Sequence, residues 1–413
     1  MTRRVVVTGL GPVTPIGIGE HEFFQGWVRS RRGIRTISHF DAEPYPVRIA
    51  GEIDVDPSPW LSARELKKMD RFAVLAVIAA DLAIEQSGLL DADCDRSRVG
   101  TFIGSGIGGS ESWLDGASAV VEGRGPRVSP RLLPNGMANS AGALVTIRHG
   151  LTGPSVSPSS ACSSGSDALV QAVQAIRSGE VLAAVAGGVD CPVTPPLVGG
   201  FSNLHALSQR NDDPEHASRP FSADRDGFVL AEGAGVLVLE EKEAALNRGA
   251  TVLAELLGYG RSSDAFHITR PSEEGDGAQL AMRRALDDSG IAPPHVDLVS
   301  AHGTATIIND ATETNAIAEV FGDDPQSVPV SSIKGLIGHT LGASGSIAAI
   351  AAVQSLVSGL APGTANLTSP DPTLRELNYI GEGTRRLDPK VVLVNSNAFG
   401  GHNVSILFAA CPR

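Results

Sequence analysis

The sequence is poor in cysteine, and its four cysteines are widely separated. Cys94, Cys162, Cys191 and Cys411 form no C-x-x-C pair, the spacing typical of structural zinc sites and of redox motifs. The sequence therefore predicts neither a metal site nor a disulfide framework. A reduced, cytoplasmic setting fits this usage best.

Basic residues are outnumbered as well. The chain has 33 Lys and Arg against 46 Asp and Glu, a net charge of -13, which argues against broad binding to nucleic acid or to a membrane surface. Aromatic residues make up only 4% of the chain, whereas 47 residues are glycine. This composition indicates tight turns and close backbone packing in a globular enzyme.

Long hydrophobic runs are also missing. The start, MTRRVVVTGLGPVTPIG, imitates a signal peptide, but Thr8, Gly9 and Pro12 interrupt its apolar run and no small-residue cleavage pattern follows. We expect a first core strand there. The apolar stretch 347–353 is too short to span a bilayer, so no membrane segment is predicted.

The chain does contain an internal repeat. Residues 164–179 (SGSDALVQAVQAIRSG) and 344–359 (SGSIAAIAAVQSLVSG), 180 positions apart, are identical at nine of sixteen positions. Each copy follows a strand-like run and ends at a glycine suited to a helix C-terminus. Two unrelated buried helices with similar packing needs are the alternative. The sequence favours a duplicated βα unit, with halves at 1–250 and 251–413.

Buried parallel strands are predicted from continuous apolar runs at 182–190, 235–241 and 390–396. Helical patterns at 69–88 and 276–290 alternate with such runs, so the fold class is α/β with layered sheets and helices. The two repeated helices are rich in small residues and poor in charge. We expect both to lie inside the protein, between sheets.

Cys162 is a candidate nucleophile. It lies in SSACSSGSDAL, where small side chains leave room for a substrate carbonyl. A sharp turn into a helix places it at the positive end of the helix dipole, which predicts a stabilised thiolate and a lowered pKa. The alternative is a packed, inert thiol.

Three further candidates lie where predicted strands end. His302 follows the strand-like run 296–303, and Lys334 and His339 lie in SSIKGLIGHTLGASGS of the second repeat. Ligands gather at the carboxyl ends of strands in open α/β sheets. A single histidine is more often a core residue, but two histidines and a lysine on glycine-rich strand exits indicate an active site.

Together these motifs resemble the β-ketoacyl-acyl-carrier-protein synthases of the thiolase superfamily, and the elongating synthase II type most closely. The resemblance runs over the whole chain, from VVVTGLGPVTPIG through SRPFSADRDGFVLAEGAG to FGGHN. It implies a thiolase-like fold with a duplicated βαβαβαββ core in five layers, α-β-α-β-α, usually in dimers. It also implies an acyltransferase that needs no cofactor, because its substrates arrive on the phosphopantetheine of an acyl carrier protein.

The resemblance assigns roles to the candidates. It implies that Cys162 accepts the acyl group, that His302 and His339 serve decarboxylation and condensation, and that Lys334 holds this constellation together. Glu313 matches the acidic residue that orders the site from behind. In the implied reaction, malonyl thioester loses CO₂ and its enolate attacks acyl-Cys162, which is a decarboxylative Claisen condensation.

The resemblance also implies a role for the glycine-rich segments. The backbone N–H groups of Phe399 and Cys162 would hold the oxyanion, while Gly400 and Gly401 allow the backbone near Phe399 to move. Ile107, in GSGIGG at 104–109, matches the floor of the acyl pocket. That segment also fits G-x-G-x-x-G, but no convincing acidic residue follows, so a dinucleotide site is not favoured.

Two departures concern the pathway. Asn397-Ala398 precedes Phe399 where the family usually has Phe-Gly, and IIND at 307–310 is similar to alpha-type ketosynthases of type II polyketide systems. Fatty-acid elongation as a homodimer and polyketide or polyene elongation beside a chain-length-factor homologue both stay open, with a slight preference for the latter. A thiolase using Cys411 and an inactive scaffold subunit are less favoured.

A basic cluster suggests where a carrier protein docks. If 61–77 is one helix, Arg64, Lys67 and Lys68 share a face at spacings of three and four residues. Carrier proteins are acidic, and the resembled synthases are basic at these positions. Three further arginines could widen the patch: Arg124, Arg127 and Arg131.

Overall fold

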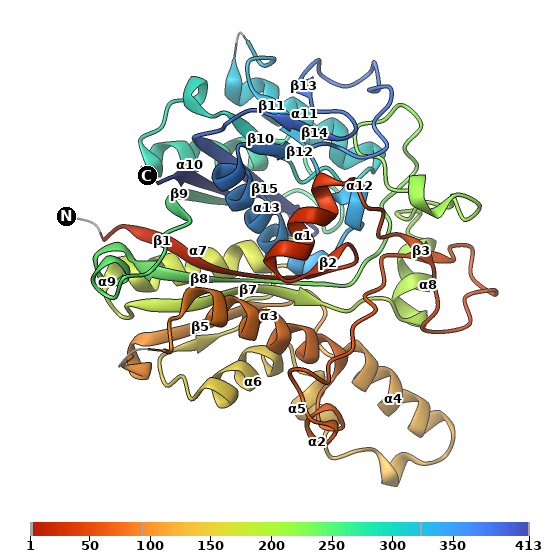
Figure 1. Cartoon of the computed structure of the whole chain (residues 1–413). Coiled ribbons are helices and arrows are strands. Elements are labelled where there is room, and N and C mark those ends of the chain that lie inside the picture. Colours follow the sequence, from red (N-terminus) through yellow and green to blue (C-terminus); the bar gives the residue numbers. More distant parts are fainter. Residues whose placement is uncertain (1–2, 92–93, 323, 412–413) are drawn as a thin grey trace.

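Ten strands form two sets of five, one from each half of the chain, and β2 (Gly17–Ile18) and β13 (Asn378–Tyr379) complete a twelve-stranded sheet (Figure 1). The computed structural model describes residues 3–91, 94–322 and 324–411. The first set is β1 (Val5–Thr14), β5 (Val99–Gly104), β6 (Ser155–Val156), β7 (Ala183–Asp190) and β8 (Gly233–Glu241). The second set is β9 (Ala254–Ser263), β10 (Leu298–Ser300), β11 (Pro329–Ser331), β15 (Val391–Ala398) and β16 (His402–Ala410).

Both sets have the same topology. Their orders are β6-β5-β7-β8-β1 and β11-β10-β15-β16-β9, so the third, second, fourth, fifth and first strands of each set follow one another. In each of these sheet orders, the first three strands are parallel to one another. The fourth strand is antiparallel to both of its neighbours, the third and the fifth. The sets join where β1 pairs with β9. The predicted duplication of the fold is thus confirmed, and the boundary predicted at residue 250 falls between β8 and β9.

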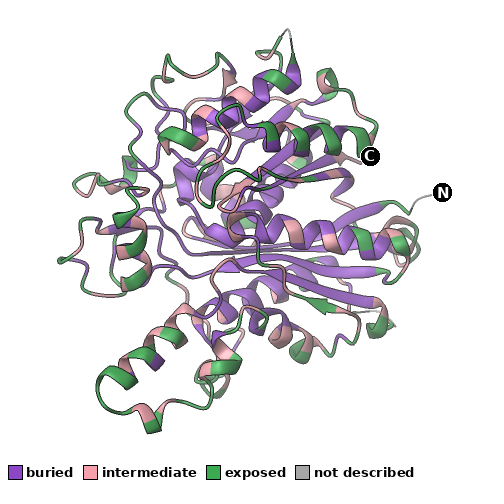
Figure 2. Ribbon diagram, turned by 180° about the vertical axis from the view of Figure 1, so that it is seen from behind, coloured by how far each residue is buried: buried purple, intermediate pink, exposed green. Residues whose placement is uncertain are grey.

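Helices cover and separate the two sets of strands. On the outer faces lie α3 (Arg71–Ser87) and α6 (Ser140–His149) for the first set, and α10 (Asp276–Ser289) and α11 (Ile307–Phe321) for the second. Between the sets lie α7 (Ser164–Ser178) and α13 (Ser344–Ser358). This is the predicted five-layer arrangement, and Figure 2 shows its inner layers as buried. The other helices used below are α2 (Ala63–Leu66), α4 (Ser110–Val121), α5 (Leu132–Gly136), α8 (Pro195–Asn203) and α12 (Lys334–Ile337).

The two central helices can approach closely because their first turns consist of small residues. A Cβ on Gly165 of α7 would come within 2.7 Å of the carbonyl oxygen of Gly342, before α13. The helical stretch Leu341–Ser358 is longer than the apolar run predicted from the sequence, and by length and composition it could cross a bilayer. However, 89% of it is buried inside the protein, as expected for a core helix.

The prediction of one helix over 61–77 is wrong. The chain forms the short helix α2 and then starts again at α3. Ser62 and Glu65 form a capping box that begins α2, while Asp70 takes an extended conformation and accepts a hydrogen bond from the N–H of Phe72. A residue that caps the second helix cannot lie inside one continuous helix.

Gly345→Ala is expected to lower the free energy of unfolding by about 1–3 kcal/mol through overpacking. Its new methyl group would meet the hydroxyls of Ser166 and Ser396, which bond to each other at 2.8 Å. Urea denaturation measures the change. The matched control is Gly200→Ala in α8, where a Cβ meets nothing within 4 Å; equal losses in the two variants would contradict the close-packing argument.

Candidate active site

Cys162 lies in a single 3-10 turn, Ala161–Ser163, directly before α7. Ala161 has a φ of 50°, a left-handed conformation that is uncommon for a residue with a side chain. The second repeat has the same turn at Leu341–Ala343, where Leu341 has a φ of 44°. The two halves thus share this strained turn, and Gly342 occupies the position in the second half that Cys162 occupies in the first.

Two buried histidines face each other near this turn. His302 follows β10, which ends at Ser300 and is shorter than predicted, and His339 follows α12. Their ring centroids are 5.2 Å apart and the rings are nearly perpendicular, at 85°. Burial lowers the pKa of each histidine well below its usual value, and the nearby charge of Lys334 lowers it further. Both imidazoles are therefore neutral at pH 7.

The partners of the two histidines determine which ring nitrogen carries the proton. Lys334 Nζ lies 3.4 Å from His302 Nδ1 and donates to the backbone carbonyl of His302 at 2.5 Å. Ser344 Oγ lies 2.8 Å from His339 Nδ1. When both groups donate to Nδ1, each neutral ring keeps its proton on Nε2.

Glu313 holds this arrangement from behind. Its carboxylate accepts the backbone N–H groups of His302 and Gly303, each at 2.7 Å. Burial raises the pKa of Glu313 and lowers the pKa of Lys334, while their opposite charges favour the ionised forms of both. The pair orients the segment that carries His302.

A cavity of about 610 Å³ connects these residues. It is lined by Cys162, His302, His339, Phe399 and Ile107. The backbone N–H groups of Phe399 and Cys162 lie close enough to the sulfur to favour its ionised form. Two neutral imidazoles, a thiol and two backbone donors around one cavity can bind an acyl group and stabilise a negatively charged oxygen.

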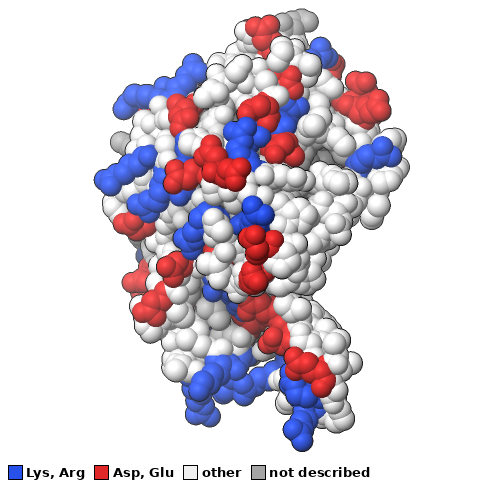
Figure 3. Space-filling model, turned by 90° about the vertical axis from the view of Figure 1, so that its right-hand side faces the viewer, with Lys and Arg blue, Asp and Glu red and all other residues white. Residues whose placement is uncertain are grey.

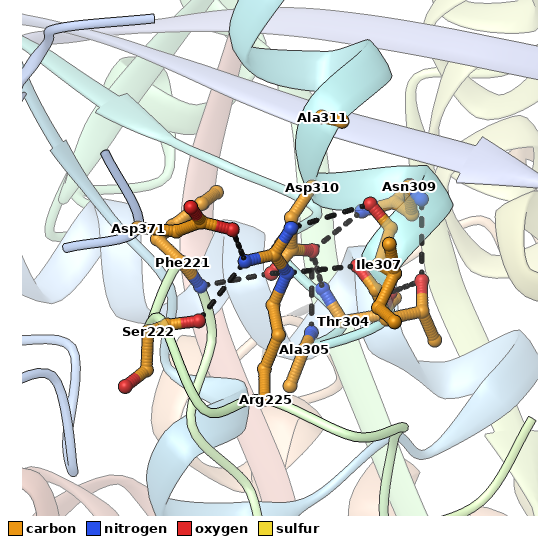
Figure 4. A network of polar contacts seen from close by, with 12 residues as sticks. Phe221, Ser222, Arg225, Thr304, Ala305, Ile307, Asn309, Asp310, Ala311 and Asp371 are labelled. Carbon is orange, nitrogen blue, oxygen red and sulfur yellow. Dashed lines mark hydrogen bonds and ion pairs between the residues drawn. The ribbon is translucent and has the colours of Figure 1, made fainter. Parts of the chain in front are cut away.

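A buried polar network lies beside this cavity (Figure 4). Asp310 accepts the backbone N–H groups of Thr304 and Ala305 at 3.1 and 3.2 Å. Arg225 lies 3.7 Å from Asp310 and donates to Asp371 at 2.6 Å. The network fixes the turn that follows His302, a role that the sequence analysis missed.

The cavity lining contains residues that the sequence analysis did not select. Thr304 and Thr306 line the cavity, and their hydroxyls are 3.0 Å apart. A signal was available in HGTAT, because two alternating hydroxyl residues directly follow the predicted strand exit. Among the described residues, no group of three or more His, Cys, Asp and Glu is placed to hold a metal ion.

Comparisons with known proteins agree with this geometry. The family models for the "Beta-ketoacyl synthase, N-terminal domain" and "Beta-ketoacyl synthase, C-terminal domain" match residues 2–245 and 253–368. The chain belongs to the β-ketoacyl synthase family. Among curated relatives, "3-oxoacyl-[acyl-carrier-protein] synthase 2" of Synechocystis sp. is 43% identical and that of Vibrio harveyi 42%, each over 98% of both chains.

Solved ketosynthase structures superpose over the whole chain. "The ishigamide ketosynthase/chain length factor" has a TM-score of 0.94 at 33% identity and covers 100% of both chains. A β-ketoacyl synthase from Burkholderia phymatum has a TM-score of 0.93 at 34% identity, covering 99% of this chain and 100% of that one. The predictions of a thiolase-like fold and of a ketosynthase of the acyltransferase class are confirmed.

The structure brings most of the predicted site residues of this ketosynthase together. Cys162, His302 and His339 line one cavity, and Lys334 contacts His302 from outside it. Gly400 and Gly401, next to the lining residue Phe399, have φ values of 83° and 72°, which glycine adopts most readily. The basic residues Arg64, Lys67 and Lys68 do not line the cavity.

The expected acidity of Cys162 is wrong. The helix dipole predicted a lowered pKa, but burial raises the pKa of Cys162 to about 12, although the charge of Lys334 and two backbone N–H groups act against it. The thiol touches the cavity, yet protein surrounds it densely enough to remove most of the water that would stabilise a thiolate. In addition, α7 begins at Ser164, two residues beyond the cysteine.

The rate of Cys162 alkylation by iodoacetamide should therefore rise about tenfold per pH unit from neutral pH, without a plateau below about pH 10. Mass spectrometry of the peptide carrying Cys162 measures the rate, and Cys162→Ala gives the background from Cys94 and Cys411. A plateau below about pH 8 would show that the thiolate is stabilised, as the sequence predicts.

Proposed function

We propose that this ketosynthase catalyses the decarboxylative Claisen condensation of a malonyl thioester with an acyl chain held on Cys162. The observation that carries the proposal is the cavity shared by Cys162, His302 and His339, with Phe399 and Cys162 supplying backbone donors at the sulfur. Both substrates are acyl groups on a carrier protein, as the names of the curated relatives indicate.

In the first step the sulfur of Cys162 attacks the acyl thioester. Because the pKa of the thiol is raised, an imidazole must accept its proton in the tautomer that leaves Nε2 free; His339 takes this tautomer when its Nδ1–H donates to Ser344 Oγ. The departing carrier thiol takes that proton away, and the ring returns to the Nε2–H form. The backbone N–H groups of Phe399 and Cys162 stabilise the oxyanion that forms. The enzyme is left with an acyl group on Cys162 and two neutral histidines.

In the second step the malonyl thioester loses CO₂. The electron pair of the broken C–C bond forms an enolate, whose oxygen accepts the Nε2–H groups of His302 and His339. The enolate carbon then attacks acyl-Cys162, and its C–S bond breaks. The released thiolate takes a proton from water, which completes the cycle without a metal or an organic cofactor.

Cys162→Ala should abolish acyl-enzyme formation and condensation. His302→Ala and His339→Ala should still form the acyl-enzyme but lose malonyl decarboxylation by about two to three orders of magnitude, as for a lost oxyanion donor. Peptide mass spectrometry and release of labelled CO₂ measure the two steps. The matched control is Cys94→Ala, which should retain both. Acylation of Cys94 or Cys191 would contradict the assignment, as would unchanged CO₂ release by either histidine variant.

We further propose that an acidic carrier protein docks on the basic end of the molecule. Figure 3 shows Lys and Arg gathered at the end where Figure 1 places α2, α4 and α5. Arg64, Lys67 and Lys68 are exposed there, although they lie on α2 and the turn after it instead of on one long helix. Arg131 is exposed beside them and donates to the backbone carbonyl of Lys67 at 2.6 Å.

Replacing Arg64, Lys67 and Lys68 with Glu should raise the KM for acyl carrier protein by about tenfold or more at low salt, because such charges mainly speed association. Activity towards a small N-acetylcysteamine thioester should be retained. The matched control reverses three exposed charges on and beside β14 (Thr384–Arg386): Arg385, Arg386 and Lys390. Equal effects of the two triple variants, or equal losses with both substrates, would exclude α2 as the docking site.

Which subunit this chain pairs with and which acyl chain it elongates depend on each other. We propose that a second ketosynthase-like chain pairs at the open edge of the sheet, where both residues of β6, Ser155 and Val156, are exposed. A homodimer for fatty-acid elongation and a heterodimer with a chain-length-factor homologue for polyketide or polyene elongation are the two forms that the sequence leaves open. Free thiols at all four cysteines support a reduced, cytoplasmic setting.

A further inference from the structure

Asp190, at the end of β7, is a buried carboxylate whose hydrogen bonds reach both halves of the chain. Its Oδ1 accepts Ser105 Oγ at 2.6 Å and the N–H of Ile107 at 3.1 Å. Its Oδ2 accepts the N–H of Gly106 at 3.0 Å and the N–H of Gly342 at 2.7 Å. Each oxygen thus has two donors, and one of the four comes from the second half.

The segments that Asp190 joins are adjacent to each other and both line the acyl cavity. Gly106 and Ile107 line it from the loop after β5, and Leu341, the neighbour of Gly342, lines it from the turn after His339. Gly342 is the counterpart of Cys162 in the second half, so the carboxylate binds the turn that corresponds to the turn of the nucleophile.

The contacts around this carboxylate are too close to tolerate displacement. A Cβ on Gly342 would lie 2.6 Å from Asp190 Oδ2 and 2.7 Å from the nitrogen of Gly106. Ser105, itself fully buried, donates to Asp190 and accepts the N–H of Gly108 at 2.8 Å. Its hydroxyl therefore links the carboxylate to a further residue of the loop. The loop that carries Ile107 is therefore held by one side chain from a neighbouring strand, together with backbone hydrogen bonds at its two ends, from Ser105 to Pro158 and from Gly109 to Gly136.

The charge of Asp190 is balanced by dipoles. Among the described residues, no Lys, Arg or His forms an ion pair with it, and three backbone N–H groups and one hydroxyl stabilise the carboxylate instead. Burial raises the pKa of Asp190 to about 6, so the carboxylate is ionised at neutral pH. Its negative charge also adds to burial in raising the pKa of Cys162.

We propose that Asp190 is a positioning residue that determines which acyl chains Cys162 accepts, by fixing the Ile107 loop against the turn at Gly342. The proposal rests on the proposed acyl transfer to Cys162. Without the carboxylate, the backbone N–H groups of Gly106 and Ile107 lose their acceptors and the loop is released. The pocket then lengthens, and long acyl chains are favoured over short ones.

The test uses Asp190→Asn, which preserves the side-chain volume but removes one acceptor oxygen and the charge. The ratio of kcat/KM for myristoyl to that for hexanoyl carrier protein should rise about tenfold, the effect of a pocket that gains room for a methylene or more. Alkylation of Cys162 should also become faster at neutral pH, because a negative charge near its sulfur is gone. Ser105→Ala, a milder change, should shift the ratio in the same direction.

The matched control is Glu240→Gln. Glu240 is a buried carboxylate of β8 that bonds Thr8 and Arg248 and does not line the cavity. This variant should lose stability without a change in the ratio. If Asp190→Asn is unstable, Ser105→Ala serves as the test. The proposal is overturned if the ratio of kcat/KM for the two acyl chains is unchanged in every variant that can be purified, whatever its loss of melting temperature. Absence of acyl-Cys162 in the unaltered enzyme would instead overturn the proposed function itself.

Discussion

The active site depends on the close contact between the first turns of α7 and α13. The nucleophile comes from the first half of the chain, and both histidines and the lysine come from the second. They can share one cavity only because Gly165 lies against the backbone of Gly342, with no room for a side chain between them. Side chains of ordinary size at these turns would move the nucleophile of the first half away from the histidines of the second.

Burial has opposite consequences for the groups in this site. It keeps His302 and His339 neutral, which leaves them as hydrogen-bond donors, but it also raises the pKa of Cys162. A thiol that is not ionised beforehand needs a base beside it. The same burial therefore raises the pKa of the thiol and keeps neutral the imidazole that can accept its proton.

The duplicated turns have diverged in what they hold. Ala161 and Leu341 keep the same left-handed backbone, so the strain belongs to the shared architecture and not to the nucleophile alone. In the second half, where Gly342 replaces the cysteine, its backbone N–H is free to bind Asp190. The repeat thereby contributes a structural anchor on one side of the cavity and a reactive sulfur on the other.

The sequence by itself determined the duplication, the strand exits and the residue types of the site, because these depend on local pattern and on spacing along the chain. Cys162, His302, Lys334 and His339 were all identifiable this way. Only the tertiary structure decided their electrostatics, since the pKa of Cys162 depends on how densely distant segments surround it. The helix start at Asp70 was missed although its cap is local. Only the tertiary structure decided which buried carboxylates hold the walls of the cavity. These contacts join residues far apart in the chain, and no local pattern records them.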